Sequence, residues 1–213
     1  CLDELLNGDM NILDLYAEDI QEALNRKEIY SVLALVDAAA EGRGNVFTPA
    51  SGADTLTYDK LVEMKTSVRK YGAKLVLITG SNVTEDVELM QFRANKFQGV
   101  NIKDIVDQWI PIESLSVTIG VTPTDVIDAD VAYLVAVSDS KKNKPGYFVR
   151  RKFNAAVLAG INDTTIVAKE RAVIVTGLIK SVEDVQSFSK GIAGFEQAGM
   201  VLSNPYTCAK FTK

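Results

Sequence analysis

Two stretches of the chain carry residues whose types and spacing could serve catalysis. The sequence from Leu75 to Asn82, LVLITGSN, predicts a strand, a glycine-containing turn and then a helix, which can present backbone N–H groups to a phosphate. Asp125, Asp128 and Asp130 lie close together and offer the oxygen ligands that Mg²⁺ and Ca²⁺ prefer. Together they define one hypothesis, a nucleotide- and magnesium-dependent enzyme.

Neither stretch completes a known signature. The turn lacks both the G-x-G-x-x-G spacing and the G-x-x-x-x-G-K-[ST] pattern, so a plain strand-to-helix turn is the favoured interpretation. The three aspartates lack the glycine and the distal glutamate of an EF-hand loop, which favours a turn before a strand. No catalytic, cofactor-binding or metal-binding residue is therefore predicted, and no cofactor is expected.

Other charged groups receive structural interpretations. Glu85, Asp86 and Glu88 are predicted to lie in the first turn of a helix, where carboxylates favour its dipole. The basic cluster KKNK, from Lys141 to Lys144, could contact a phosphate backbone or an acidic neighbour, but solvation of a loop tip is the commoner explanation. Trp109 and Cys208 are interpreted as packing residues.

The composition excludes several classes of protein. Histidine is absent, which removes Ser-His-Asp and Cys-His catalysis and most transition-metal sites. A net charge of −5 and a pI of about 4.9 disfavour sequence-specific DNA binding. The two cysteines, Cys1 and Cys208, are too few for a disulfide scaffold and indicate a reducing, cytoplasmic setting. The longest apolar run, Val131–Val137, has the length of a buried strand, so no membrane span is expected.

Periodicity predicts helices early in the chain. Residues 11–40 contain no glycine or proline and repeat apolar side chains near the helical period, which predicts a single long helix of about 45 Å. Such a helix must lie across the body of the protein as a spine or join two parts. Thr57 is a predicted cap for a helix over residues 58–71, Gly72 a predicted left-handed residue at its end, and residues 74–78 a strand. A further helix is predicted over residues 83–97.

The last third of the chain is predicted to be rich in strands. Short strands and turns are predicted between residues 102 and 121, and residues 130–137 and 147–153 are predicted to form a β-hairpin around a polar loop. Strands over residues 171–178 and 200–202 follow. Helices concentrated early and mostly antiparallel strands late indicate the α+β class.

This order of elements resembles the major capsid proteins of tailed bacteriophages, which have the Hong Kong 97-like fold. The resemblance is carried by LALVDAAAEG at the end of the long helix, by TYDKLVEMKTSVRKYGAKLVLITGSNV, and by the terminal GFEQAGMVLSNPYTCAKF. It implies a peripheral domain with the spine helix over residues 1–50, a mainly axial domain over 51–170, and a return to the peripheral domain over 171–213. The stretch from Gly194 to Phe211 would then be the closing strand and loop that reach the spine.

The resemblance implies a non-enzymatic structural protein of the virion. Its copies would form the pentamers and hexamers of an icosahedral shell, assembled in the host cytoplasm around double-stranded DNA without sequence-specific binding. Portal, scaffold or decoration proteins would be its other partners, with no membrane involved. The family carries an N-terminal arm and an extended loop before the spine, whereas only ten residues precede Asn11 here, so the resemblance places those elements outside this chain or makes Cys1 a processed end.

Three alternatives stay open from the sequence. An encapsulin-like nanocompartment subunit would share the fold and enclose a cargo enzyme instead of DNA. An enzyme would use the turn from Leu75 to Asn82 as a phosphate site with Asp125, Asp128 and Asp130 as a magnesium site. A plain adaptor domain within a larger phage or bacterial protein is the third.

Overall fold

The chain divides into two compact units. The computed structural model describes residues 12–97, 101–113, 115–119, 122–138, 144–150, 165–168, 171–176, 191–196 and 198–213. One unit comprises Cys1–Arg26 and Phe148–Gly199, and the other comprises Lys27–Tyr147 and Met200–Lys213. The second is called the sheet unit below, because it holds the largest sheet. The described residues combine helices and sheets, as predicted from the sequence.

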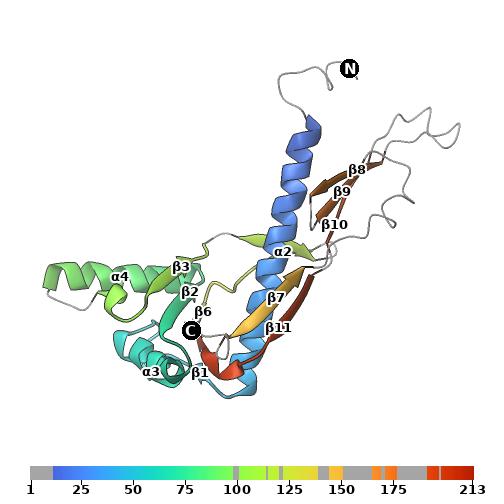
Figure 1. Cartoon of the computed structure of the whole chain (residues 1–213). Helices are drawn as coiled ribbons and strands as arrows, with labels where there is room; N and C mark the ends of the chain where they lie inside the picture. The colour runs from blue at the N-terminus through green and yellow to red at the C-terminus, as the bar shows by residue number, and fades with distance from the viewer. Residues whose placement is uncertain are drawn as a thin grey trace, which may run out of the picture. The chain divides into compact units, whose positions relative to one another are not determined.

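Helix α2, Ile12–Gly42, is the longest element of the described structure, with 31 residues (Figure 1). It is continuous, so the prediction of one unbroken helix over residues 11–40 is confirmed within the usual uncertainty of helix ends. No glycine or proline interrupts it before Gly42, and Asn45 N–H donates to the Ala40 carbonyl at 2.9 Å where the helix ends.

The sheet unit is built on a five-stranded mixed sheet. The strand order is β1-β12-β6-β2-β3. The outer pairs β1/β12 and β2/β3 are parallel, and the central pairs β12/β6 and β6/β2 are antiparallel. The strands are β1 (Val46–Phe47), β12 (Cys208–Thr212), β6 (Val131–Val137), β2 (Lys74–Thr79) and β3 (Gln108–Pro111).

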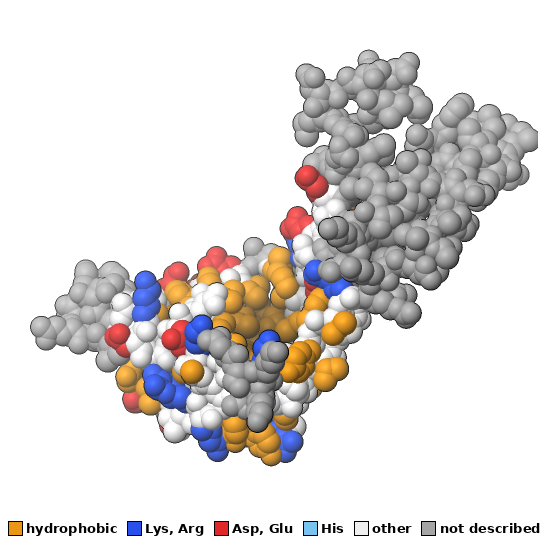
Figure 2. Space-filling view, viewed as in Figure 1, with side chains coloured by type: hydrophobic (Ala, Val, Ile, Leu, Met, Phe, Trp, Pro, Cys, Tyr) orange, Lys and Arg blue, Asp and Glu red, His pale blue; other side chains and the backbone are white. Residues whose placement is uncertain are grey.

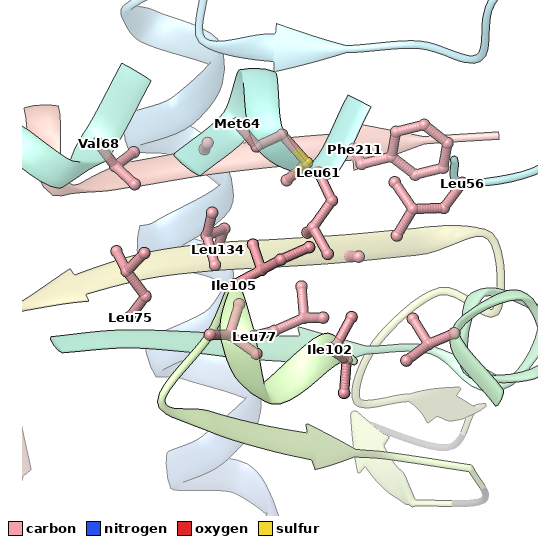
Figure 3. Close-up of a cluster of buried hydrophobic side chains, with 14 of the residues drawn as sticks. Leu56, Leu61, Met64, Val68, Leu75, Leu77, Ile102, Ile105, Leu134 and Phe211 are labelled. Carbon is pink, nitrogen blue, oxygen red and sulfur yellow. The ribbon is translucent and has the colours of Figure 1, made fainter. Parts of the chain in front are cut away.

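Strand β6 lies at the centre because its residues are apolar on both faces. All of its side chains from Val131 to Ala136 are buried, as expected of a strand covered on both sides. On one face Leu134 packs in a cluster with residues of the helical segments, shown in Figure 3. On the other face Tyr133 and Val135 pack with Leu33 and Val36 of α2. The sheet therefore forms the middle layer of the sheet unit.

The segments that cover the first face are α3 (Tyr58–Val68), η1 (Arg69–Tyr71), α4 (Ser81–Phe97) and η2 (Ile102–Asp104). Thr57 caps α3 as predicted, since its side chain accepts a hydrogen bond from Lys60 N–H at 3.4 Å. Ile102, in the region predicted as short strands and turns, begins a 3-10 helix capped by Asn101. Both longer helices contribute buried apolar side chains at helical spacing, which are Leu61, Met64 and Val68 of α3 and Val83 and Val87 of α4.

Three smaller sheets complete the described structure. Strands β4 (Ser116–Ile119) and β5 (Thr122–Asp125) form an antiparallel pair. Strands β8 (Thr165–Ala168), β9 (Arg171–Thr176) and β10 (Gly191–Glu196) form an antiparallel sheet in the order β10-β9-β8. Strand β7 (Gly146–Arg150) forms a two-stranded sheet with β11 (Ala198–Leu202).

The predicted hairpin of residues 130–137 with residues 147–153 is wrong. Strand β6 has β12 on one side and β2 on the other, so it has no free edge for the strand that follows it in sequence. Strand β7 pairs with β11 instead, and the Pro145 carbonyl accepts hydrogen bonds from Ser203 N–H and Asn204 N–H at 2.9 and 3.1 Å. Residues 141–143 of the basic cluster and residues 151–153 lie outside the described residues.

Gly72 is also corrected by the structure. Its φ of −162° is extended backbone, and not the left-handed conformation predicted for the end of the helix. A Cβ at this position would lie 2.8 Å from the Ala136 carbonyl carbon and the Val137 nitrogen. The glycine is therefore needed for the close approach of η1 to β6.

Candidate functional site

The turn from Leu75 to Asn82 is the candidate for phosphate binding, and its Gly80 and Asn82 N–H groups are already occupied. Gly80 N–H donates to the Val131 carbonyl at 2.9 Å, and Asn82 N–H donates to the Ala129 carbonyl at 3.0 Å. Val83 N–H also reaches the Ala129 carbonyl, at 3.4 Å. A phosphate would have to compete with these backbone bonds, which favours the plain strand-to-helix turn between β2 and α4.

Two of the three aspartates considered for magnesium, Asp128 and Asp130, accept hydrogen bonds from their own chain. Asp128 Oδ1 accepts Asp130 N–H at 3.0 Å, and Asp130 Oδ1 accepts the Asn82 amide Nδ2 at 2.7 Å. These carboxylates therefore hold the turn that precedes β6, in the manner typical of aspartate in turns. Within the ranges that the structure describes, no three Asp, Glu or Cys side chains are grouped closely enough to hold a metal ion.

The structure brings together a different set of polar groups, on the face of the sheet that α2 covers. The Lys210 ammonium lies 2.7 Å from an oxygen of Asp37 and 2.7 Å from an oxygen of Glu41. The Tyr133 hydroxyl donates to Asp37 Oδ1 at 2.8 Å. This spine cluster, defined as Asp37, Glu41, Tyr133 and Lys210, joins α2 to β6 and β12. Sequence reasoning missed it, because its members come from three distant segments.

Burial and charge change the acid–base behaviour of the spine cluster. Burial raises the pKa of the Tyr133 hydroxyl far above its ordinary range, and the hydrogen bond to Asp37 raises it further. Burial alone would lower the pKa of Lys210, but the hydrogen bonds and negative charges of Asp37 and Glu41 outweigh it and raise the pKa. Both groups therefore hold their protons more tightly in the folded state than in the unfolded state.

We expect the free energy of unfolding of the sheet unit to fall as the pH rises above about 10, the ordinary pKa of tyrosine. Protonated Tyr133 and Lys210 contribute their full stabilisation below that pH. The contribution is lost as the pH rises from the unfolded-state pKa to the higher folded-state pKa of each group. Tyr133→Phe should make the alkaline decline shallower by up to about 1.4 kcal/mol per pH unit. Urea unfolding at several pH values, followed by fluorescence of Trp109, the single tryptophan of the chain, measures this slope.

Tyr58→Phe is the matched control, because Tyr58 is 40% exposed and lies outside the spine cluster. This variant should keep the wild-type slope. An equal slope for wild type and Tyr133→Phe would contradict the buried hydrogen bond to Asp37.

The closing segment, residues 200–213, is tied to the end of α2 by further contacts. Asn45 Nδ2 donates to the Cys208 carbonyl at 2.7 Å, and Arg43 donates to the Tyr206 hydroxyl at 3.0 Å. The Tyr206 ring also stacks on Tyr71, with centroids 5.4 Å apart. Cys208 is buried, as predicted for a packing residue, and burial raises the pKa of its thiol. The part of the predicted closing stretch that lies in the sheet unit therefore does return to the long helix.

The acidic residues of α4 have different roles from those predicted. The helix begins at Ser81, so its first turn contains no acidic residue and the dipole interpretation is wrong. Asp86 is buried and accepts Leu56 N–H at 2.9 Å, with the Lys213 ammonium 3.2 Å from the same carboxylate. Glu85 and Glu88 are exposed.

Trp109 has a hydrogen-bonding role in addition to packing. Its Nε1–H donates to Thr79 Oγ1 at 3.0 Å, and this hydroxyl lies 2.7 Å from Thr84 Oγ1. The chain of three side chains connects β3, β2 and α4, and it satisfies polar groups that would otherwise be buried without a partner.

Two surface grooves of the sheet unit carry opposite charge. One, of about 500 Å³, lies beside α2 and is lined by Asp37, Asp125, Asp128 and apolar neighbours. The other, of about 470 Å³, lies on α3 and is lined by Lys65, Arg69 and Lys70. Figure 2 shows charged side chains of both signs on one face of the molecule, with hydrophobic side chains exposed between them.

Comparison with known proteins gives distant structural likenesses. No protein-family model and no curated protein matches the sequence. A phage-related protein from Bordetella bronchiseptica RB50 is similar with a TM-score of 0.48 and 12% identity, over 78% of this chain and 54% of that one. A candidate capsid protein of a prophage from Escherichia coli CFT073 is similar with a TM-score of 0.44 and 10% identity, over 79% of this chain and 52% of that one.

The chain thus spans about half the length of both solved structures. Both TM-scores are below 0.5, so these likenesses carry no functional argument. No helix in the described part of the chain has the length and apolar character needed to cross a membrane.

Proposed function

We propose that this chain is the major capsid protein of a tailed bacteriophage, a structural subunit with the Hong Kong 97-like fold. In this proposal its copies form the pentamers and hexamers of an icosahedral head that encloses double-stranded DNA. The chain acts in the virion and is assembled in the host cytoplasm. The peripheral and axial domains implied by the resemblance, over 1–50 with 171–213 and over 51–170, belong to the same proposal.

The observation that carries the proposal is the fastening of the chain's last strand to one long helix. Lys210 of β12 reaches Asp37 and Glu41 of α2, and the Asn45 amide reaches the Cys208 carbonyl just beyond the helix. A spine helix, a helix-strand unit and a closing strand that returns to the spine follow one another in the order expected for a shell subunit of this kind.

The surface of α2 supports an assembly role. Ile29, Val32 and Leu35 are large apolar residues of this helix, and each is at least 36% exposed in the single chain. Exposed apolar side chains on one element are typical of surfaces that other chains cover. Closed shells need such contacts around rotational axes.

The charge of the chain is compatible with a DNA container. At a net charge of −5 the subunit lacks an overall basic footprint, so it would hold double-stranded DNA without binding it tightly. The alternative of a nucleotide- and magnesium-dependent enzyme has less support, because the Gly80 and Asn82 N–H groups have backbone acceptors and Asp128 and Asp130 hold the turn before β6.

Assembly of the native gene product tests the proposal. The protein should be produced with whatever segments its gene encodes around this chain, and its mass followed by size-exclusion chromatography with light scattering and by electron microscopy. We expect closed shells of uniform diameter. A product that remains monomeric at high concentration would contradict the proposal, and shells that enclose an enzyme instead of DNA would favour the encapsulin-like alternative.

A further inference from the structure

The groove on α3 is basic on a protein that is acidic as a whole. Lys65 and Arg69 stand one helical turn apart, and Lys70 adds a third positive charge beside the Tyr71 ring, 4.9 Å from its centroid. Asp104 is the acidic residue of the groove, and its backbone carbonyl accepts a bond from Lys65 Nζ at 3.3 Å. The groove therefore carries a net positive charge.

The same groove offers apolar surface. Tyr58 is 40% exposed at one end of it, and Val62 and Ile105 contribute to its lining. Arg69 is exposed and forms no ion pair among the described residues. A ligand for this groove should combine carboxylates with an apolar side chain.

Helix α4 presents that combination on its outer face. Glu85, Glu88 and Leu89 are spaced i, i+3 and i+4, so they lie on one side of the helix. All three are exposed, and Leu89 is the most open of them at 52%. The opposite side of α4 is buried in the core through Val83 and Val87. The acidic face of α4, defined as Glu85, Glu88 and Leu89, is therefore exposed and takes no part in the buried clusters of the described residues.

We propose that the basic groove on α3 of one copy receives the acidic face of α4 of a second copy. Glu85 and Glu88 would pair with Lys65 and Arg69, and Leu89 would cover the apolar surface at Tyr58 and Val62. This is the helix-in-groove mode of recognition, with charge complementarity that fixes which helix enters. The inference rests on the proposed shell function and names the contact between its subunits.

The geometry of this contact fits a closed assembly. The groove and the acidic face are different surfaces of the same sheet unit, so each copy offers one of each. A contact between unlike surfaces is heterologous and runs head to tail, which generates rings when the rotation between copies closes. Pentamers and hexamers need a contact of this type.

Charge reversal and charge exchange test the inference in the whole gene product. E85K/E88K alone and K65E/R69E alone should each raise the concentration needed for half-assembly by about tenfold or more, because like charges then face each other. Combining all four reversals in one chain should restore assembly to within about threefold of wild type, because the reversed charges then pair at every contact of pentamers and hexamers alike. Circular dichroism and Trp109 fluorescence of each variant establish that it is folded.

K27E/K144E is the matched control. It changes the net charge by the same amount as K65E/R69E, at two exposed lysines outside the groove, and should assemble as wild type does. If both reversals assemble as wild type does, the contact is overturned while the shell function stands. If wild type itself stays monomeric, the shell function is overturned and the contact with it.

Nucleic acid is the other partner that a basic groove could bind. Binding of a duplex DNA of random sequence distinguishes this possibility from contact with a second copy. We expect K65E/R69E to lower the weak affinity for this DNA no more than K27E/K144E does, because the two variants carry the same change in net charge and the groove is directed to a second copy. A loss of DNA binding in K65E/R69E, together with unimpaired assembly, would overturn the inference and assign the groove to the nucleic acid.

Discussion

Replacing Phe211 with alanine is expected to lower the free energy of unfolding of the sheet unit by about 3 to 5 kcal/mol. Phe211 is completely buried in β12 and belongs to the cluster that contains Leu56, Leu61 and Met64, as Figure 3 shows. The sheet on one side and α3 on the other hold the walls of the site in place. The cavity left by the ring would therefore remain largely open, and the cavity cost would add to the lost burial.

Urea unfolding followed by Trp109 fluorescence is the appropriate measurement, because this tryptophan lies in the sheet unit and reports on that unit. Tyr58→Ala is the control, since it removes an aromatic ring from the same unit at a position that is 40% exposed. The control should change the free energy of unfolding by less than about 1 kcal/mol. Equal costs for the two variants would show that Phe211 is not a core residue.

Elements with strong local signals could be predicted from the sequence. The long helix follows from thirty residues without glycine or proline, α3 follows from its Thr57 cap and apolar stripe, and β2 follows from a short apolar run after Gly72. Each of these signals lies within the element itself. Local physics was therefore sufficient for their existence and for most of their bounds.

Strand pairing could not be predicted in the same way, because it depends on segments far apart in the chain. Strand β6 was expected to pair with the strand that follows it, whereas its partners are β2 and β12. A signal was present in its sequence, VAYLVAV, since a run that is apolar at every position favours a strand covered on both faces. Such a strand lies inside a sheet and needs two neighbours.

The polar contacts of the sheet unit were also beyond sequence reasoning. Nothing in the sequence distinguishes Lys210 from the other lysines. Its ion pairs with Asp37 and Glu41 form because β12 lies beside α2. Asp86 and Glu85 are neighbouring acidic residues that lie on different sides of α4. Asp86 is buried and pairs with Lys213, whereas Glu85 is exposed. The angular position of a residue on α4 could be computed from the sequence, but the direction of the core could not.

Gly80→Ala is expected to destabilise the sheet unit by about 3 kcal/mol or more. A Cβ at this position would lie 2.1 Å from the Asp128 carbonyl oxygen and 2.9 Å from the Ala129 carbonyl oxygen. Both are backbone atoms, so no side chain can turn aside to relieve the overlap. The turn before β6 would have to move away from α4, which would strain the bonds from Gly80 N–H to Val131 and from Asn82 N–H to Ala129.

Gly42→Ala is the control, because nothing lies within 4 Å of a Cβ built at Gly42. Alanine in the last turn of α2 should leave the stability unchanged or raise it by up to about 1 kcal/mol, since alanine is the better helix former. Urea unfolding of both variants by Trp109 fluorescence makes the comparison. A Gly80→Ala protein as stable as wild type would mean that the turn of residues 128–130 does not pack against the start of α4. The same contact occupies the Gly80 and Asn82 N–H groups, which a phosphate would need. That result would therefore favour the enzyme alternative.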